Sequence, residues 1–214
     1  MIFSTDNPQS TPAWRNPAVI LACLLLASCA GGNLPGPAPG PVAEEPTETV
    51  QDSGYIELEP GVEEDFQFAV ALMENDEFER AIPKLESVVA REQRLIAPYI
   101  NLAIAYRKTG DYEQAEKQLT QALTIDPRHP VANNELGLVY RKAGRFDEAR
   151  AAYEKAIASD PKFAVAKRNL GVLCDLYMHD FVCALEQFQQ YLELKPDDED
   201  VPIWIADLKQ RTGQ

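Results

Sequence analysis

Few residues in this 214-residue chain are of types that do covalent or metal chemistry. The chain has four cysteines and two histidines, and no close pairing among them resembles the spacing of zinc ligands. No Ser-His-acid, Cys-His or HxxE arrangement supports catalysis, and the acidic residues are spread over solvated helix faces. We therefore expect no catalytic residues, no metal site and no cofactor, and we expect a protein that is not an enzyme.

Cys29 has the clearest chemical context of the four cysteines. It ends the stretch Leu-Ala-Ser-Cys, directly after an apolar run of ten residues, 18–27, that Arg15 precedes. Ten residues are about half of the roughly 20 that span a bilayer, and the order of charged, apolar and small residues is that of a secretory signal. The stretch 26–29 resembles the lipobox of bacterial lipoproteins, which implies cleavage after residue 28 and acylation of the Cys29 thiol.

The lipobox resemblance implies a lipoprotein signal peptide over residues 1–28 and a mature chain that begins at lipidated Cys29. A plain secretory signal and a buried apolar helix are the two alternatives. Several acyl chains exceed what stable anchoring requires, so the protein is expected to be held on a membrane and not in it. Ala30 stands where an aspartate would retain such a lipoprotein, and the resemblance therefore implies the outer membrane, facing the periplasm.

Composition narrows the class of partner. The chain has 34 acidic and 20 basic residues, a net charge of −14, and a negative surface repels phosphate backbones and anionic lipids. Nucleic acid is excluded on this ground, and contact with a membrane is expected through the lipid anchor only. The apolar share of 45% and the charged share of 25% are typical of a globular domain.

Residues 29–61 separate the lipidated cysteine from the rest of the chain. From residue 30 onward this segment contains six prolines and six acidic residues but no lysine or arginine. Such a composition cannot bury a core, and the Pro-Gly alternation favours extended conformations. We interpret the segment as a disordered linker that holds a folded domain clear of the membrane.

An internal repeat follows the linker. The segments that start at Asn101 and Asn134 align with an offset of about 34 residues, a period typical of a helical repeat. The matched pairs are Leu102 with Leu136, Tyr106 with Tyr140, Gly110 with Gly144, Ala115 with Ala149, Ala122 with Ala156, and Pro127 with Pro161. The same register predicts four units, 62–95, 96–129, 130–163 and 164–198, of which the last has one extra residue between Cys174 and Ala184.

Each unit has the pattern of two helices. In the two middle units, apolar residues recur at three- and four-residue spacing on both sides of a central glycine, and a proline ends the second stripe, whereas no proline closes the first unit. This pattern resembles the tetratricopeptide repeat (TPR) family. The resemblance implies an all-α, right-handed superhelical solenoid of helix-turn-helix units. Residues 199–214 resemble half a unit, and we expect them to form a capping helix that closes the stack.

The TPR resemblance also implies where a partner would bind, in a concave groove lined by the first helix of each unit. Most groove positions are apolar, which favours an amphipathic helix or apolar extended segment of a partner protein over a small-molecule substrate. Apolar residues also stand where a carboxylate clamp needs polar groups, so we reject that function. The candidate groove residues are Phe66, Val70, Ile100, Asn101, Ile104, Asn134, Leu138, Arg168, Asn169 and Val172.

Cys174 and Cys183 lie on either side of the extra residue of the fourth unit. One is near the end of the unit's first predicted helix and the other near the start of its second. An oxidising periplasm permits a disulfide, but a bridge needs α-carbons within about 7 Å. Two buried free thiols remain the alternative from sequence alone.

The combined pattern favours a non-enzymatic scaffold, a lipid-anchored periplasmic TPR lipoprotein that binds a partner segment and supports an envelope assembly. Lipoproteins of similar layout serve pilus and secretion system biogenesis, which we place slightly ahead. A regulatory adaptor of peptidoglycan-remodelling enzymes or of an energy-transduction complex is the alternative. Self-association through the groove is a third possibility.

Overall fold

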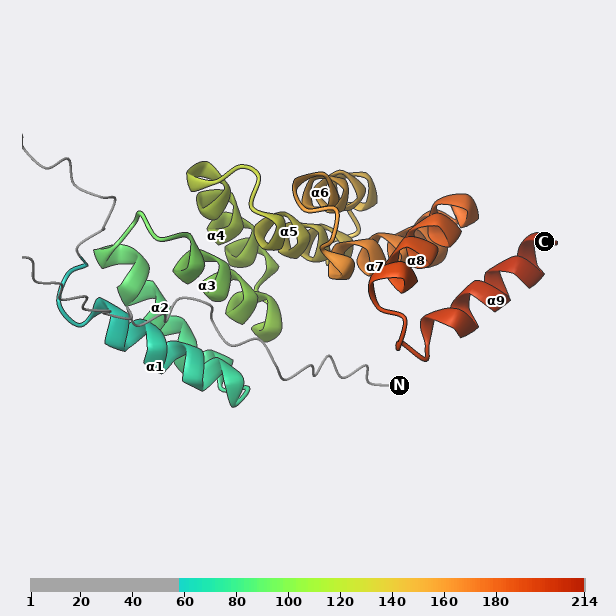
Figure 1. The fold of residues 1–214 in the computed structure, drawn as a ribbon. Helices are drawn as coiled ribbons and strands as arrows, with labels where there is room; N and C mark the ends of the chain where they lie inside the picture. Colours follow the sequence, from blue (N-terminus) through green and yellow to red (C-terminus); the bar gives the residue numbers. More distant parts are fainter. Residues whose placement is uncertain (1–57, 214) are drawn as a thin grey trace, which may run out of the picture. The chain divides into compact units, whose positions relative to one another are not determined.

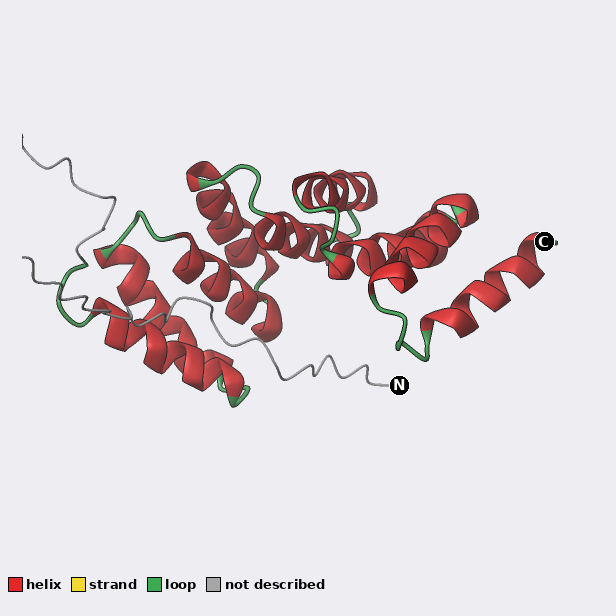
Figure 2. Cartoon of the chain, in the orientation of Figure 1, coloured by secondary structure: helices red, strands yellow, loops and turns green. Residues whose placement is uncertain are grey.

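The computed structural model describes residues 58–213, and this range contains helices and loops but no strand (Figures 1 and 2). The elements are α1 (Val62–Glu74), α2 (Phe78–Arg91), α3 (Ile96–Thr109), α4 (Tyr112–Ile125), α5 (Pro130–Lys142), α6 (Phe146–Ser159), α7 (Ala164–Leu173), the π-helix η1 (Cys174–Met178), α8 (Phe181–Leu194) and α9 (Val201–Thr212). This arrangement confirms the predicted all-α class. The predicted signal peptide, Cys29 and the linker up to residue 57 lie outside the described residues.

The helices follow one another in chain order from α1 to α9 (Figure 1). The two helices of each pair pack closely on one another, α1 on α2, α3 on α4, α5 on α6 and α7 on α8. Each second helix also packs on the first helix of the next pair, and successive first helices touch one another. Short loops of two or three residues join the helices of the first three pairs, as expected for helical hairpins, whereas η1 and two further residues join α7 to α8. None of the helices in residues 58–213 combines the length and the apolar character needed to cross a membrane.

The ends of the central helices follow from local sequence. Gly110 ends α3 with a φ of 91°, a left-handed conformation in which glycine has no Cβ penalty. Asp111 then begins α4, because its side chain accepts a hydrogen bond from the backbone N–H of Gln114 at 3.1 Å. Such a cap satisfies a donor that the first helical turn would otherwise leave free.

Small residues let the two helices of a hairpin approach each other. A Cβ on Gly137 of α5 would lie 2.5 Å from Cε1 of Tyr153 on α6, and a Cβ on Gly171 of α7 would lie 2.5 Å from Cε1 of Phe188 on α8. The ring therefore occupies the space that a side chain on the first helix would need. The 34-residue period repeats this ring-on-glycine packing in the third and fourth units.

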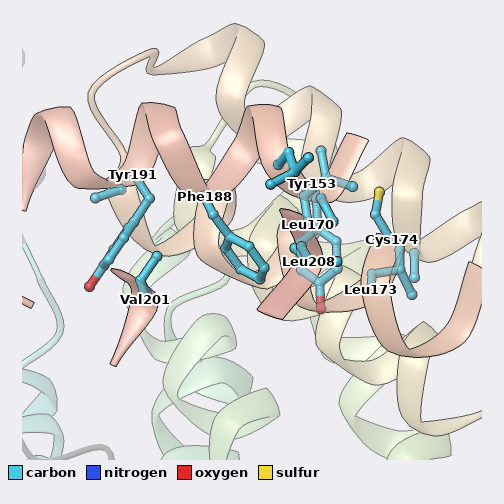
Figure 3. Packing of buried hydrophobic residues seen from close by; sticks show 12 residues of the cluster. Tyr153, Leu170, Leu173, Cys174, Phe188, Tyr191, Val201 and Leu208 are labelled. Carbon is cyan, nitrogen blue, oxygen red and sulfur yellow. The ribbon is translucent and has the colours of Figure 1, made fainter. Parts of the chain in front are cut away.

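Three apolar clusters form the core, and all lie within residues 62–208. The largest joins the third unit, the fourth unit and α9, with Phe188 and Leu208 at its centre (Figure 3). Val201 and Leu208 of α9 are fully buried, so this helix closes the stack. Because the repeat region has a core of its own, it meets the definition of an independent folding unit.

The extra residue of the fourth unit is absorbed by the π-helix η1. A π-helical turn contains one more residue than an α-helical turn and is a common way to accommodate an insertion. His179 ends η1 with a φ of 54°, and the backbone N–H of Asp180 donates to the carbonyl of Cys174 at 2.8 Å. The chain thereby returns to the repeat register at Ala184.

Candidate protein-binding surface

The first helices of the repeats, α1, α3, α5 and α7, together with α9, carry the groove positions that the TPR resemblance implies. We call the side chains at these positions the inner surface. Spacings of three and four residues place these side chains on one face of each helix. The candidates that the structure leaves half-buried, and hence partly open to solvent, are Phe66, Val70, Asn101, Ile104, Leu138, Arg168, Asn169 and Val172.

Two candidate groove residues are closed to a ligand, which corrects the prediction for them. Ile100 is 6% exposed and Asn134 is 2% exposed. Ile100 belongs to the apolar cluster that joins α3 to α5. The Oδ1 atom of Asn134 accepts a hydrogen bond from Nδ2 of Asn169 at 2.9 Å. The physical reason is that first helices of neighbouring units pack directly on one another, so positions between them become interior.

Arg168 has a structural partner in the capping helix. Its guanidinium lies 4.9 Å from the centre of the Trp204 ring, and that ring in turn lies 5.4 Å from the ring of Phe188. A guanidinium over an aromatic face is held by the negative potential of the ring. Arg168 therefore helps to dock α9, in addition to any contact that it makes with a partner.

The apolar side chains that reach furthest into solvent on the inner surface lie at its C-terminal end. Val165 of α7 is 51% exposed and Ile203 of α9 is 66% exposed; Leu176, on the adjoining η1 and outside the groove positions, is 60% exposed. Sequence reasoning did not single out Leu176 or Ile203. Ile203 follows Arg168 by 35 residues, which is the repeat period plus the inserted residue. This spacing could have identified Ile203 as a groove position.

A buried ion pair lies where the first helices of the second and third units meet. Nε of Arg107 donates to Oε2 of Glu135 at 2.9 Å, with side chains 21% and 11% exposed. Beside this pair, burial raises the pKa of the Tyr153 hydroxyl, whose oxygen has no hydrogen-bond partner among the described residues. The junction of α3 and α5 is therefore polar at the Arg107–Glu135 pair, with apolar groove residues on both helices beside it.

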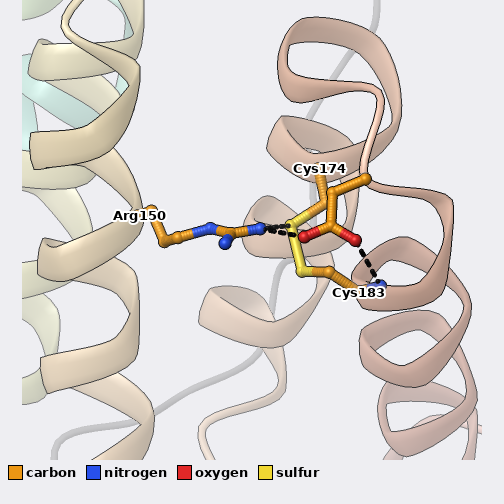
Figure 4. Close-up of a disulfide and its surroundings, with 4 residues drawn as sticks. Arg150, Cys174 and Cys183 are labelled. Carbon is orange, nitrogen blue, oxygen red and sulfur yellow. Dashed lines mark hydrogen bonds and ion pairs between the residues drawn. A yellow bond between two sulfur atoms is a disulfide. The ribbon is translucent and has the colours of Figure 1, made fainter.

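Cys174 and Cys183 are joined by a disulfide with a Cα–Cα distance of 5.9 Å, so the structure has the bridge and not the two free thiols. Nη2 of Arg150 donates to Oδ2 of Asp180 at 2.5 Å and lies 3.3 Å from Sγ of Cys174 (Figure 4). This hydrogen bond lowers the pKa of Asp180. The two sulfurs and the Asp180 carboxylate lie close together, but bridged sulfurs are not thiolate ligands, so this cluster does not form a metal site.

A shallow pocket of about 350 Å³ lies beside the disulfide, between α6 and α8. Its lining includes Arg150, Asp180, Cys183 and Gln187. Nε of Arg150 and Oε1 of Gln187 are buried without a partner, so a ligand in the pocket would not reach them in this conformation. The pocket therefore adds no small-molecule site to the inner surface.

Comparison with known proteins agrees with this geometry. Residues 100–174 match the family model described as "Tetratricopeptide repeat". No curated protein sequence matches the chain. A solved thermophilic TPR protein of Thermus thermophilus is similar at 27% identity and a TM-score of 0.60, over 69% of this chain and 80% of that one.

Two further solved structures are similar in fold. The pilF protein of Pseudomonas aeruginosa has 21% identity and a TM-score of 0.65, over 71% of this chain and 69% of that one. The first TPR of Spaghetti (RPAP3), bound to the HSP90 peptide SRMEEVD, has 19% identity and a TM-score of 0.53, over 56% of this chain and 96% of that one. In that neighbour the fold holds a peptide segment, and the tetratricopeptide repeat is typically a non-catalytic interaction module. With their 34-residue period and paired helices, residues 100–174 of this chain are tetratricopeptide repeats.

Proposed function

We propose that this protein is a non-enzymatic scaffold that binds an apolar segment of a partner protein on its inner surface. The exposure of Val165 and Ile203 on the inner surface, each at least half open to solvent, is the observation that carries the proposal. Burying large apolar side chains from water is favourable by about 25 cal/mol per Å². Exposed apolar side chains that gather on one face of a repeat fold are typical of an interaction site.

The proposal includes the place where the scaffold works. The stretch Leu-Ala-Ser-Cys that ends at Cys29 resembles a lipobox, and the proline-rich acidic linker to residue 61 provides a spacer. We propose a lipid anchor on the periplasmic face of the outer membrane. The layout of anchor, linker and repeats resembles that of lipoproteins in pilus and secretion system biogenesis, so these are the assemblies to test first.

The anchor is tested independently of the groove. Metabolic labelling with an alkyne fatty acid marks the acylated thiol, and a Cys29→Ser variant removes that thiol. We expect label on the wild-type chain in the outer-membrane fraction and none on the variant. Label on both proteins would place the acyl group elsewhere, and label on neither would leave the protein unanchored; either result contradicts the proposed anchor.

The binding face is tested by paired charge substitutions. Val165→Glu combined with Ile203→Glu places two carboxylates on the inner surface at exposed positions, where folding tolerates them. Val182→Glu is the matched control, because Val182 is 74% exposed but lies on the second helix of its unit. Each protein is cross-linked in an envelope extract, and its partners are identified by mass spectrometry.

We expect the double variant to lose a partner that the wild type and the control both retain. Circular dichroism on each variant checks that helicity is unchanged. Equal retention of every partner by both variants would contradict binding on the inner surface and would place the site on another face or in the linker.

A further inference from the structure

Four basic residues on or beside the inner surface, Lys108, Arg141, Lys142 and Arg168, have no acidic partner within residues 58–213, unlike Arg107, which pairs with Glu135. Lys108 of α3 and Lys142 of α5 occupy equivalent positions 34 residues apart, and both are exposed. Neither forms an ion pair within residues 58–213. No lysine of residues 58–213 forms an ion pair, so what distinguishes Lys108 and Lys142 is their repeated position on successive first helices in a chain with a net charge of −14.

Two of these four residues are arginines. Arg141 of α5 and Arg168 of α7 also form no ion pair within residues 58–213, and the Nε atom of each is buried without a hydrogen-bond partner. By contrast, Arg145 and Arg150, at the start of and within α6, both pair with carboxylates. The buried Nε atoms are closed to a ligand, so any carboxylate of a partner would have to approach the remaining parts of these two half-buried guanidinium groups.

Aromatic rings hold three of these cations in place. Nζ of Lys108 lies 5.5 Å from the ring centre of Phe78. The guanidinium of Arg141 lies 5.8 Å from the ring centre of Tyr177, and that of Arg168 packs in the same way on α9. A side chain that is already oriented loses less conformational entropy when a ligand binds.

The cations alternate with apolar side chains along each first helix. Lys108 follows Ile104 by four residues and Lys142 follows Leu138 by four, so each pair lies side by side on one helix face. A segment that satisfies this surface needs apolar side chains and carboxylates next to one another. A purely apolar segment would leave the cations covered and unpaired, which is costly.

We infer that the partner segment of the inner surface is acidic as well as apolar, with carboxylates that pair with Lys108, Arg141, Lys142 and Arg168. This inference rests on the proposed function, because it names the chemical class of segment that the same surface binds. Opposite charges at an interface contribute to specificity and to the rate of association more than to raw affinity. The surface would thereby reject basic segments of equal apolar content.

The test uses three synthetic amphipathic peptides with the same leucine positions, whose intervening residues are all Glu, all Gln or all Lys. Binding to the repeat region, residues 58–213, is measured by fluorescence anisotropy at low salt and at about 0.5 M salt, where the Debye length falls to a few ångströms. Lys108→Gln with Lys142→Gln is the test variant. Lys117→Gln with Lys155→Gln, exposed on α4 and α6, is a control with the same change of net charge.

We expect the Glu peptide to bind at least about tenfold more tightly than the Gln peptide at low salt, and the Lys peptide to bind most weakly. High salt or the test variant should reduce the preference for Glu, whereas the control variant should retain it. Competition by the chain's own linker, seen as weaker Glu-peptide binding when residues 30–57 are present, would also support an acid-binding surface.

The outcomes separate this inference from the proposed function. Equal binding of the Glu and Gln peptides, with both abolished by Val165→Glu and Ile203→Glu, overturns the acidic partner and leaves the groove as the binding face. An equal loss of Glu-peptide binding in the test and control variants also overturns it, because the effect would then follow net charge alone. Binding of none of the peptides at about 1 mM, a limit of about −4 kcal/mol, overturns both.

Discussion

Gly137→Ala tests the ring-on-glycine packing that sets the distance between the helices of a hairpin. A Cβ at this position would lie 2.5 Å from Cε1, 2.6 Å from Cδ1 and 2.9 Å from Cζ of Tyr153. Real Cβ atoms do not approach ring carbons this closely. The Tyr153 ring is fully buried and has no solvent to move into. Either α5 or α6 must therefore shift.

The two contributions to the free energy of unfolding have opposite signs. Alanine stabilises a helix interior by about 1 kcal/mol relative to glycine. Overpacking a well-packed core costs about 1–3 kcal/mol, and occasionally more. We place this site at the upper end, because three ring carbons lie within 3 Å of the new atom. The expected net loss is about 2 kcal/mol, or about 4–8 °C in Tm for a domain of this size.

The assay is thermal unfolding of the repeat region followed by circular dichroism, in a double-mutant cycle with Tyr153→Leu. Leucine removes the ring, so the same Gly137→Ala change in that background should stabilise the protein by about 1 kcal/mol through helix propensity. The change of sign between the two backgrounds is the diagnostic result. If Gly137→Ala raises Tm in the wild-type background, the helices adapt freely and the packing argument is refuted. Gly171→Ala opposite Phe188 repeats the test in the next unit.

Three further predictions concern single contacts. Cys174 and Cys183 are nine residues apart in the sequence, so replacing both by serine should lower the free energy of unfolding by about 2.5 kcal/mol by the loop-entropy relation. An unchanged Tm with and without reductant would contradict this. Hydrogen bonds from the side chain and the backbone N–H of Arg94 lower the pKa of Glu92 from 4.5 to about 2, so this contribution to stability is complete above about pH 4.5 and is lost as pH falls toward 2. In an NMR titration, Arg94→Gln should lose the part of the shift that comes from the guanidinium and keep the part that comes from the backbone N–H. Asn134→Ala leaves Nδ2 of the half-buried Asn169 without its acceptor and should lower the free energy of unfolding by about 1 kcal/mol in chemical denaturation, whereas a loss below about 0.5 kcal/mol would show that this hydrogen bond contributes little.

The 34-residue period was sufficient to predict the helical class and the ends of the central helices. Gly110 and Asp111 are adjacent residues with opposite local requirements, a left-handed φ and a side-chain cap, and both requirements are properties of residue type. The matched Gly144 also has a left-handed φ, 76°, and it directly follows Ala143, the C-cap of α5. Features of this kind are local, so they can be predicted without knowing what the helices pack against.

The burial of individual groove positions could not be predicted in this way. A period identifies which face of a helix points inward, but it does not state how closely the next helix approaches. Ile100 and Asn134 occupy equivalent positions, and both are closed by a neighbouring first helix. The asparagine pair offered a signal, since Asn134 and Asn169 lie 35 residues apart on successive first helices, a separation that allows their amides to meet.

The disulfide of the irregular fourth unit could not be predicted from the sequence either. The alignment located one extra residue after Cys174, but the residue types did not state whether it would form a longer loop or a wider helical turn. The π-helix η1 adopts the second solution. The distance between the α-carbons of the two cysteines, which decides whether they can be bridged, depends on that choice and could not follow from spacing alone.

The position of the disulfide has a consequence for binding. In a stack of repeats each unit is stabilised only by its neighbours, so the terminal units open first. The exposed apolar residues of the inner surface lie mainly in the fourth unit and α9, where opening would be most frequent. The disulfide, the Arg168–Trp204 contact and the hydrogen bonds from Arg211 to Asp175 and Asp207 all act on this end. They keep Val165 and Ile203 presented on ordered helices, and a partner then binds without first ordering its site.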